Sequence, residues 1–289
     1  MRVGVLILPE PPWAAAVKKW RLAEELGFDH AWTYDHIAWG ELRDSPWLAS
    51  VPTLAAAAAA TTAIRVGTLV ASPNFRHPVP FARELISLDD ISGGRLTLGV
   101  GSGGQGWDAT ILGQQPWSLA ERHNRFAEFV NLLDLLLRQP ETSFSGRYWN
   151  AHEARTYPGC VQEPRIPFAI AATGPRSMRV AATHASVWVT NGDRSHRGTP
   201  LGPEEGAAVV ARQLALFDEI CRAEGRDPAS IGRLVLTGPR LDAGLQSPNA
   251  FIEVKEAYAA VGVTDLVVHW PRPTEPYAGD ESILELILD

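Results

Sequence analysis

Short apolar runs alternate with amphipathic segments along the whole chain, and this alternation predicts strands and helices in turn. The apolar runs predict eight strands, at residues 3–8, 29–34, 65–70, 95–100, 167–171, 185–189, 233–237 and 264–269. Helical spacing predicts the segments that follow them, at residues 14–26, 47–61, 80–91, 118–138, 176–183, 204–224, 250–261 and 281–288. Eight such alternations favour an α/β fold, the (β/α)₈ or TIM barrel, with a doubly wound open sheet as the alternative.

Three segments interrupt this alternation. Residues 144–150 resemble a short hairpin strand, within an insertion at about 142–166. Residues 190–203 form a long polar loop, and residues 270–279 carry three prolines after the last predicted strand. We expect one domain over residues 1–289, with the insertion and the loop attached to it.

Composition excludes several classes of partner. The 289 residues carry a net charge of −7 with a pI near 5.6, which argues against a nucleic-acid or anionic-membrane surface. No apolar run approaches the roughly 20 residues of a membrane span, and the first residues lack the flanks of a signal peptide. Cys160 and Cys221 form neither a disulfide scaffold nor a metal-ligand pattern. We therefore expect a cytoplasmic protein that holds no metal.

The stretch from Ser92 to Gly104 carries the strongest local signal. It reads as a helix end at two glycines, then a buried strand, then a loop that contains Gly101, Gly103 and Gly104. In a parallel barrel, ligands bind at the carboxyl ends of the strands. Missing β-carbons let a flat ring or a phosphate approach the main chain there. A plain turn between strand and helix is the alternative interpretation.

Other polar and aromatic residues follow other predicted strands, which would gather them on the same face of the barrel. His36 is a residue type that suits acid–base catalysis, although a lone histidine after a strand is more often structural. Thr173-Gly174-Pro175-Arg176 precedes a predicted helix. The free backbone N–H groups of such a first turn favour a phosphate, and a simple N-cap is the alternative.

Several motifs together resemble one family. They are Ala23 to Asp29, Asp35-His36, Arg65 to Val70, Arg76-His77-Pro78, Ser92 to Gly101 and Phe144 to Trp149. Over nearly its whole length the chain resembles the luciferase-like oxidoreductases, in the branch that depends on the deazaflavin F420. The resemblance implies a bacterial luciferase-like barrel that holds F420 or a flavin at the carboxyl ends of its strands.

The same resemblance implies roles for individual residues. Asp35 would contact the deazaflavin ring region or its side chain, and His36 would donate a proton or activate the substrate. Trp39 would pack beside the reacting carbon. The Leu69-Val70 peptide bond falls where the family has a cis bond that supports the ring, and Ser72 lies beside it. Thr173, Gly174, Pro175 and Arg176 match the family's phosphate-binding turn.

The glycine loop also departs from the family's patterns. Gly104 stands where sugar-phosphate dehydrogenases of the family carry a catalytic glutamate. Ser102 stands where FMN monooxygenases carry an arginine for the FMN phosphate, and Gly101 where luciferases carry a cysteine. Gly101, Ser102 and Gly103 complete the expected cofactor site. The absent arginine favours F420 over FMN, although Arg176 offers a replacement charge.

We therefore predict an F420-dependent oxidoreductase that transfers a hydride between carbon 5 of the deazaflavin and a small organic substrate. The substrate would be a carbonyl, an alcohol or an activated double bond. His36 is the expected proton donor, with Glu10 as the second candidate. The expected substrate pocket has apolar walls, formed by Trp39, Phe75, Trp107 and Trp270. The alternatives are an FMN-dependent monooxygenase that uses reduced flavin and oxygen, and a non-catalytic flavin- or F420-binding protein. The partner is a small molecule, and the sequence leaves a homodimer open.

Overall fold

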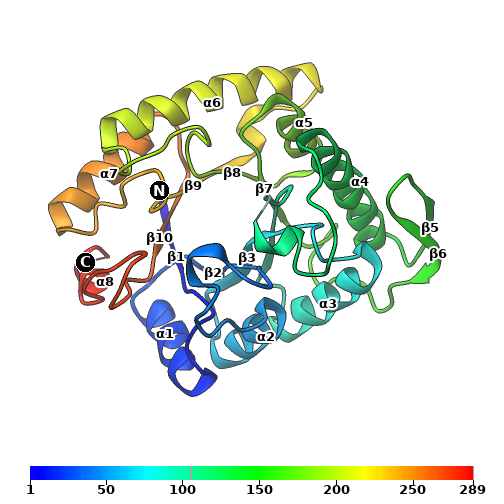
Figure 1. The fold of residues 1–289 in the computed structure, drawn as a ribbon, viewed down its shortest axis with the longest axis horizontal. Helices are drawn as coiled ribbons and strands as arrows, with labels where there is room; N and C mark the ends of the chain where they lie inside the picture. The colour runs from blue at the N-terminus through cyan, green and yellow to red at the C-terminus, as the bar shows by residue number, and fades with distance from the viewer. Residues whose placement is uncertain (105, 289) are drawn as a thin grey trace.

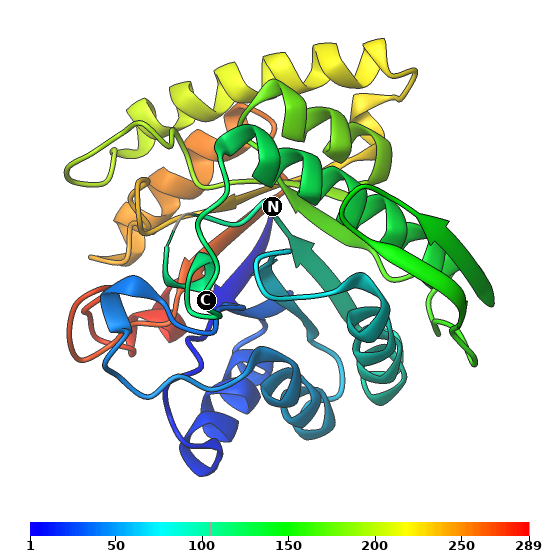
Figure 2. The same cartoon turned by 45° about the vertical axis from the view of Figure 1, so that its right-hand side comes forward.

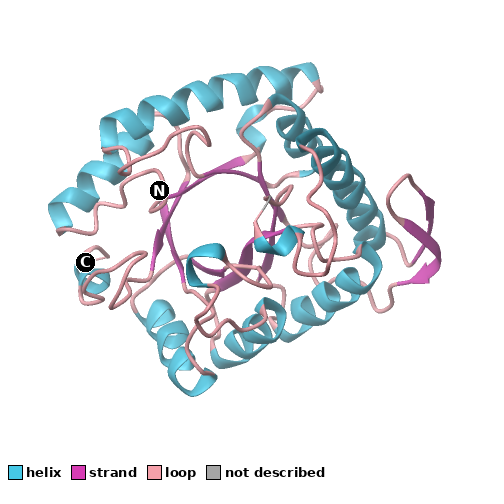
Figure 3. Cartoon of the chain, in the orientation of Figure 1, coloured by secondary structure: helices cyan, strands magenta, loops and turns pink. Residues whose placement is uncertain are grey.

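A closed barrel of eight parallel strands forms the centre of the molecule, as predicted. The computed structural model describes residues 1–104 and 106–288. The strands pair in the order β1-β10-β9-β8-β7-β4-β3-β2. They are β1 (Arg2–Leu6), β2 (His30–Thr33), β3 (Arg65–Ala71), β4 (Leu96–Val100), β7 (Phe168–Ala171), β8 (Val187–Thr190), β9 (Gly232–Leu236) and β10 (Asp265–His269). The helices surround this ring of strands (Figures 1 and 3).

The helices follow the predicted segments, with ends that shift by a few residues. They are α1 (Trp13–Glu25), α2 (Ser50–Ala60), α3 (Pro78–Ile91), α4 (Leu119–Arg138), α5 (Pro175–His184), α6 (Pro203–Ala223), α7 (Pro248–Ala260) and α8 (Ile283–Leu286). The predicted start of α4 is confirmed by its cap, where the Ser118 hydroxyl accepts from the Glu121 N–H. None of the described helices is both long and apolar enough to cross a membrane.

Alternate residues of each strand serve two different cores. On β1, Leu6 belongs to a cluster in the barrel interior, whereas Val5 packs with the surrounding helices. On β2, Trp32 and Ala31 divide in the same way. Both faces of the strands are therefore buried, which explains why the sequence shows continuous apolar runs instead of a polar–apolar alternation.

An antiparallel hairpin, β5 (Glu141–Ser145) and β6 (Asn150–Arg155), follows α4 and lies outside the barrel (Figure 2). The prediction of a strand over residues 144–150 is wrong in its centre, because the chain turns there. The Glu128 carboxylate on α4 accepts from the backbone N–H groups of Arg147, Tyr148 and Trp149 at 2.7–3.0 Å. These N–H groups are thus used by a side chain from another element instead of a strand ladder.

The amino end of the barrel is tied together by a buried carboxylate, Asp265 on β10. It accepts hydrogen bonds from the Arg2 guanidinium at 2.7 and 2.8 Å, from His30 Nε2 at 3.1 Å and from the Thr264 hydroxyl. Burial alone would raise the pKa of Asp265, but the bonds from His30, Arg2 and Thr264 outweigh it. They hold the pKa of Asp265 well below the ordinary value of 3.8.

We expect Asp265 to make stability depend on pH in the acid range. Because its pKa is depressed in the folded state, its contribution is complete above about pH 4 and is lost as the pH falls further. Urea unfolding of Asp265→Asn and the parent, compared from about pH 6 to about pH 3, should show a difference in free energy that shrinks with acidity. A difference that stays constant over this range would contradict the assignment.

Candidate active site

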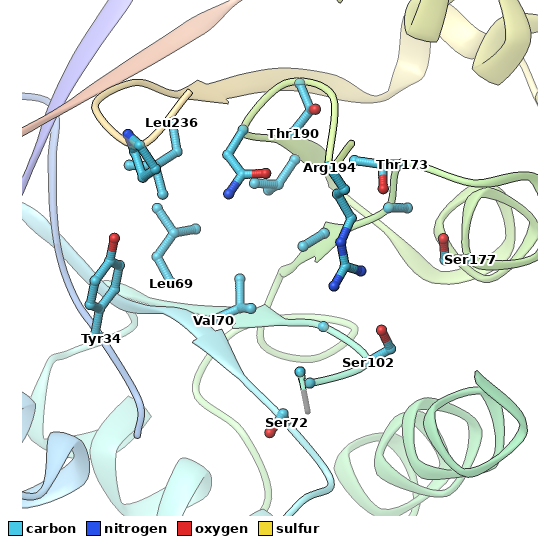
Figure 4. Close-up of a pocket in the computed structure, with 18 of the residues that line it drawn as sticks. Tyr34, Leu69, Val70, Ser72, Ser102, Thr173, Ser177, Thr190, Arg194 and Leu236 are labelled. Carbon is cyan, nitrogen blue, oxygen red and sulfur yellow. The ribbon is translucent and has the colours of Figure 1, made fainter. Parts of the chain in front are cut away.

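A cavity of about 360 Å³ opens at the carboxyl ends of the strands (Figure 4). Residues from the ends of β2, β3, β4, β7, β8 and β9 line it, as expected for the ligand face of such a barrel. It brings together His36, Trp39, Leu69, Val70, Ser72, Gly101, Ser102, Gly103, Gly104 and Thr173 from the sequence predictions.

The floor of the cavity comes from an irregularity in β3. The register of β3 against β4 shifts between Thr68 and Ala71, so that the consecutive residues Leu69 and Val70 both reach the cavity. The peptide bond between Leu69 and Val70 is cis, which confirms the prediction for this position. The Leu69 and Val70 side chains together give the cavity an apolar floor.

The glycine loop packs directly against this floor. A β-carbon on Gly101 would lie 2.9 Å from the Val70 side chain. Gly103 has φ +71°, and a β-carbon there would lie 2.7 Å from the Asn74 side chain. Asn74 in turn donates to the Gly104 carbonyl at 3.3 Å. Because Gly101 and Gly103 lack β-carbons, the loop can lie close to Val70 and Asn74.

His36 lines the cavity, and a carboxylate orients its ring. Its Nδ1 atom is hydrogen-bonded to Asp108 Oδ2, and about a third of the His36 side chain is exposed. The other oxygen of Asp108 accepts from the backbone N–H groups of Ile37 at 2.7 Å and Ala38 at 3.2 Å. Asp108 thus holds the His36 ring through Nδ1, which leaves Nε2 as the ring nitrogen not bonded to Asp108.

A second histidine, His269, contacts the cavity residue Tyr34. Its Nε2 atom pairs with the Tyr34 hydroxyl at 2.8 Å, and its ring stacks on Tyr277 with centroids 3.6 Å apart. Burial lowers the pKa of His269 to about 3. His269 therefore holds Tyr34, a cavity residue, without adding a charge to the site.

Asp35 is placed differently from His36, its neighbour in the chain. It is 2% exposed, and the Arg76 guanidinium donates to both its oxygens, at 2.7 and 2.8 Å. The Ser50 hydroxyl also donates to it. Since these groups use the carboxylate, the structure gives Asp35 an anchoring ion pair behind the cavity, and Asp35 is absent from the described lining.

Glu10, the second candidate for the proton donor, is also engaged elsewhere. The Arg272 guanidinium donates to both its oxygens, at 2.7 and 2.9 Å. This bidentate ion pair joins the segment after β1 to the segment after β10. Glu10 is not among the described residues that line the cavity.

Of the four aromatic residues expected in the substrate pocket, Trp39 alone is in the described lining. Trp270 belongs to the core outside the barrel, where its Nε1 atom donates to Glu281 at 2.7 Å. Trp107 is 43% exposed, with the Arg43 guanidinium 4.3 Å from its ring. Phe75 packs beside Arg76, at 5.2 Å. Each of these three side chains thus has a partner away from the cavity.

The phosphate-binding turn predicted at residues 173–176 lines a second, larger cavity of about 1030 Å³. Thr173, Gly174, Pro175 and Arg176 form part of its wall at the start of α5. The two cavities adjoin, because Ser102, Thr173, Ser177 and Arg194 line both. The two cavities therefore meet at these four residues, near the first turn of α5.

Several residues of the site were missed by the sequence analysis. They are Tyr34, Asp108, Ala171, Ala172, Ser177, Val189, Thr190, Asn191, Arg194, Leu236, Pro239 and Arg240. Most lie at strand ends or just after them, so their position on the chain was the available signal. Asp108 lies in the short helical turn Trp107–Ala109 between β4 and α4, and Arg194 lies in the loop between β8 and α6. Neither segment shows a periodicity that indicates which way a side chain points.

Known proteins resemble the chain over nearly its whole length. The profile of a family described as luciferase-like monooxygenase matches residues 1–239. An F420-dependent glucose-6-phosphate dehydrogenase of Beutenbergia cavernae is 33% identical, over 87% of this chain and 85% of the relative. An F420-dependent hydroxymycolic acid dehydrogenase of Mycobacterium tuberculosis is 28% identical, over 88% of this chain and 71% of the relative.

A solved structure shares the fold. The F420-dependent secondary alcohol dehydrogenase in complex with an F420–acetone adduct superposes with a TM-score of 0.81. It is 18% identical, and the match covers 99% of this chain and 96% of that one. The barrel, the site at its carboxyl face and the profile match lead to the same assignment: the chain belongs to the luciferase-like monooxygenase family, and it is an oxidoreductase.

Proposed function

We propose that this protein is an F420-dependent oxidoreductase, which transfers a hydride between carbon 5 of the deazaflavin and a small organic substrate. The observation that carries the proposal is the His36–Asp108 pair, which faces a cavity with a flat glycine loop and an apolar floor. The F420-dependent relatives in Beutenbergia cavernae and Mycobacterium tuberculosis support F420 as the cofactor.

The residues present fit such a cofactor. A planar ring needs a flat bed, and a β-carbon on Gly101 or Gly103 would collide with Val70 or Asn74. We assign the ring contacts to Leu69, Val70, Ser72, Gly101, Ser102 and Gly103. We assign the phosphate of the cofactor's side chain to the start of α5, at Thr173, Gly174, Pro175 and Arg176.

When bound, F420 supplies the site that gives or takes the hydride. The chain supplies the proton. His36 holds it at Nε2, while Asp108 keeps Nδ1 occupied and the ring aimed at the substrate. Trp39 stacks parallel to Tyr277, with ring centroids 6.2 Å apart, and forms an apolar wall beside His36. This wall limits the access of water to the reacting groups.

The substrate in this proposal is a carbonyl, an alcohol or an activated double bond. Among the described residues that line the cavity, His36 and Asp108 form one acid–base pair. The resemblance implies a further acid–base residue, a catalytic glutamate, in sugar-phosphate dehydrogenases. Gly104 occupies that position and brings no ionisable side chain. We therefore do not extend the sugar-phosphate substrate of the Beutenbergia cavernae relative to this chain.

An FMN-dependent monooxygenase is the second candidate. A 4-hydroxyprotoasukamycin monooxygenase of Streptomyces nodosus subsp. asukaensis is 32% identical, over 62% of this chain and 48% of the relative. Oxygen consumption with reduced FMN distinguishes this reaction from F420-dependent hydride transfer. A non-catalytic binding protein would show neither reaction.

We expect F420 to bind more tightly than FMN. Ser102 lines the cavity where FMN monooxygenases of the family carry an arginine. A charge-assisted contact to phosphate changes affinity by about ten- to a hundredfold. Fluorescence titration of the purified protein with each cofactor measures the two dissociation constants. Equal affinity for FMN, together with oxygen consumption, would replace the proposal by the second candidate.

A further inference from the structure

Tyr277 has an uncommon backbone conformation for a large side chain. It lies in the segment between β10 and α8, and its φ is +68°. Among the described residues other than glycine, Glu153 alone shares a φ in this left-handed region. The residues beside it in the chain, such as Glu275 and Ala278, are exposed, whereas Tyr277 packs against the core inside the barrel. A bulky residue stays in this conformation only where the surrounding structure holds it there.

The segment around Tyr277 is anchored by Arg272. The Arg272 guanidinium donates to both oxygens of Glu10, at 2.7 and 2.9 Å. It also donates to the carbonyls of Thr274 and Pro276, at 3.1 and 2.9 Å. The Arg272 N–H donates to the Tyr277 carbonyl at 2.8 Å. One residue therefore ties this segment to the segment after β1 and closes it into a loop that contains Tyr277.

The ring of Tyr277 is stacked against two other rings. Its centroid lies 3.6 Å from that of His269 and 6.2 Å from that of Trp39. Its hydroxyl lies 3.3 Å from the Tyr34 hydroxyl. Gly238, with φ +112°, leaves room for the ring, since a β-carbon there would lie 3.0 Å from Tyr277 Cε1. Trp39 and Tyr34 line the cavity of about 360 Å³, and Tyr277 is absent from its described lining. Tyr277 therefore lies behind two residues of the cavity wall.

The aromatic residues of this wall are packed against one another. Tyr34 lies at one side of the cavity, beside Leu69 (Figure 4). The Trp39 ring lies 5.2 Å from the Tyr34 ring and 6.0 Å from the Trp47 ring, measured between centroids. Because Tyr277 fills the space behind Tyr34 and Trp39, neither ring can move away from the cavity to admit a longer ligand.

We propose that Tyr277 is a positioning residue that limits the length of the substrate. Its ring holds Trp39 and Tyr34 in place and closes the space behind them. The pocket then accepts short-chain carbonyl compounds or alcohols and excludes longer ones. This substrate class rests on the proposed function, since the cavity of about 360 Å³ is then shared with the deazaflavin ring.

The test is the relative activity toward ketones of different length. The value of kcat/KM for oxidation of reduced F420 is measured with acetone, methyl butyl ketone and methyl hexyl ketone. We expect the parent and Tyr277→Phe to prefer the short ketones. Tyr277→Ala should raise the ratio of kcat/KM for methyl hexyl ketone to that for acetone by at least about tenfold, because one methylene in an apolar pocket changes kcat/KM by that much. A loss of folded protein lowers both values equally and leaves the ratio unchanged.

Two further variants complete the comparison. Tyr277→Leu keeps an apolar side chain in the core and should shift the ratio in the same direction, even if Tyr277→Ala does not fold. Tyr157→Ala removes a ring that is 63% exposed and outside the described lining of the cavity, so the ratio should stay that of the parent. An unchanged ratio in folded Tyr277→Leu and Tyr277→Ala would overturn the inference. A shift in Tyr277→Phe as large as that in Tyr277→Ala would also overturn it, because the ring would then not be the limiting group.

Binding without turnover separates this inference from the proposed reaction. Calorimetric titration of butanol and octanol into the parent, Tyr277→Phe and Tyr277→Ala gives the ratio of the two Kd values in each protein. If no ketone oxidises reduced F420 in the parent, the proposed function fails. A ratio that then favours octanol more strongly in Tyr277→Ala than in the parent and Tyr277→Phe would sustain the limit on ligand length. The same ratio in all three proteins would overturn it.

Discussion

His36→Asn should bind F420 like the parent and lose about 10²–10⁴-fold in turnover, the usual contribution of a positioned general acid. Asparagine keeps a similar size and a hydrogen-bonding group, but it cannot carry the titrating proton. Because the His36 side chain is about a third exposed and lies at the cavity wall, the fold should tolerate the change. The measurement is single-turnover oxidation of reduced F420 by a panel of carbonyl compounds, together with a titration of F420.

Two controls separate catalysis from structure. His152→Asn changes an exposed histidine on the β6 strand and should leave turnover unchanged. Asp108→Asn removes the group that orients His36, and we expect it to slow turnover and alter the pH profile. Since Asp108 acts through His36, the double variant should be no slower than His36→Asn alone. Full activity in His36→Asn, or loss of F420 binding, would remove His36 from the role of proton donor.

Asp35→Asn should lower the free energy of unfolding by about 3–5 kcal/mol, because it leaves Arg76 buried without its main partner. The Asp35 side chain is 3% exposed and that of Arg76 is 13% exposed. Burial lowers the pKa of Arg76, but the bonds to Asp35 outweigh burial and raise it, so Asp35 is the group that compensates for the burial of this guanidinium. Urea unfolding measures the loss.

The same arginine provides the matched control. Glu84, with a side chain that is 46% exposed, pairs with Arg76 at 3.0 Å. Glu84→Gln should cost no more than about 1 kcal/mol, since exposed ion pairs contribute little. F420 affinity, measured on the folded variants, then separates the anchoring role from the cofactor contact implied by the family resemblance. A small loss of stability with much weaker F420 binding would favour the cofactor contact.

The barrel strands were predictable because both their faces are buried. A strand such as β4 (Leu96–Val100) reads as an apolar run whatever its neighbours are, so pattern alone places it. The hairpin was less predictable. Its turn depends on Glu128, which lies on another element and reaches the turn only in the folded state. The hydrophobic pattern of residues 144–150 does not indicate this contact with Glu128.

The site residues, too, differ in how well the sequence predicts them. The floor residues Leu69 and Val70 and the glycine loop lie at strand ends, and the structure brings both to the cavity. Two of the residues placed in the site from the sequence have partners outside the cavity instead. Glu10 turns to Arg272, more than 260 positions away in the chain, and Trp270 turns outward to Glu281. Asp108 was missed for the same reason, because its role depends on a residue 72 positions earlier.

Asp108 also has a mechanical consequence. Its carboxylate holds the His36 ring and the backbone of Ile37 and Ala38, while its own backbone belongs to the short helical turn Trp107–Ala109 that follows the glycine loop. Asp108 therefore links the segment after β2 to the segment after β4. Any opening of the mouth that displaces one segment either carries the other with it or breaks all three hydrogen bonds. One carboxylate thus sets both the direction of the His36 ring and the position of its backbone relative to the segment after the glycine loop.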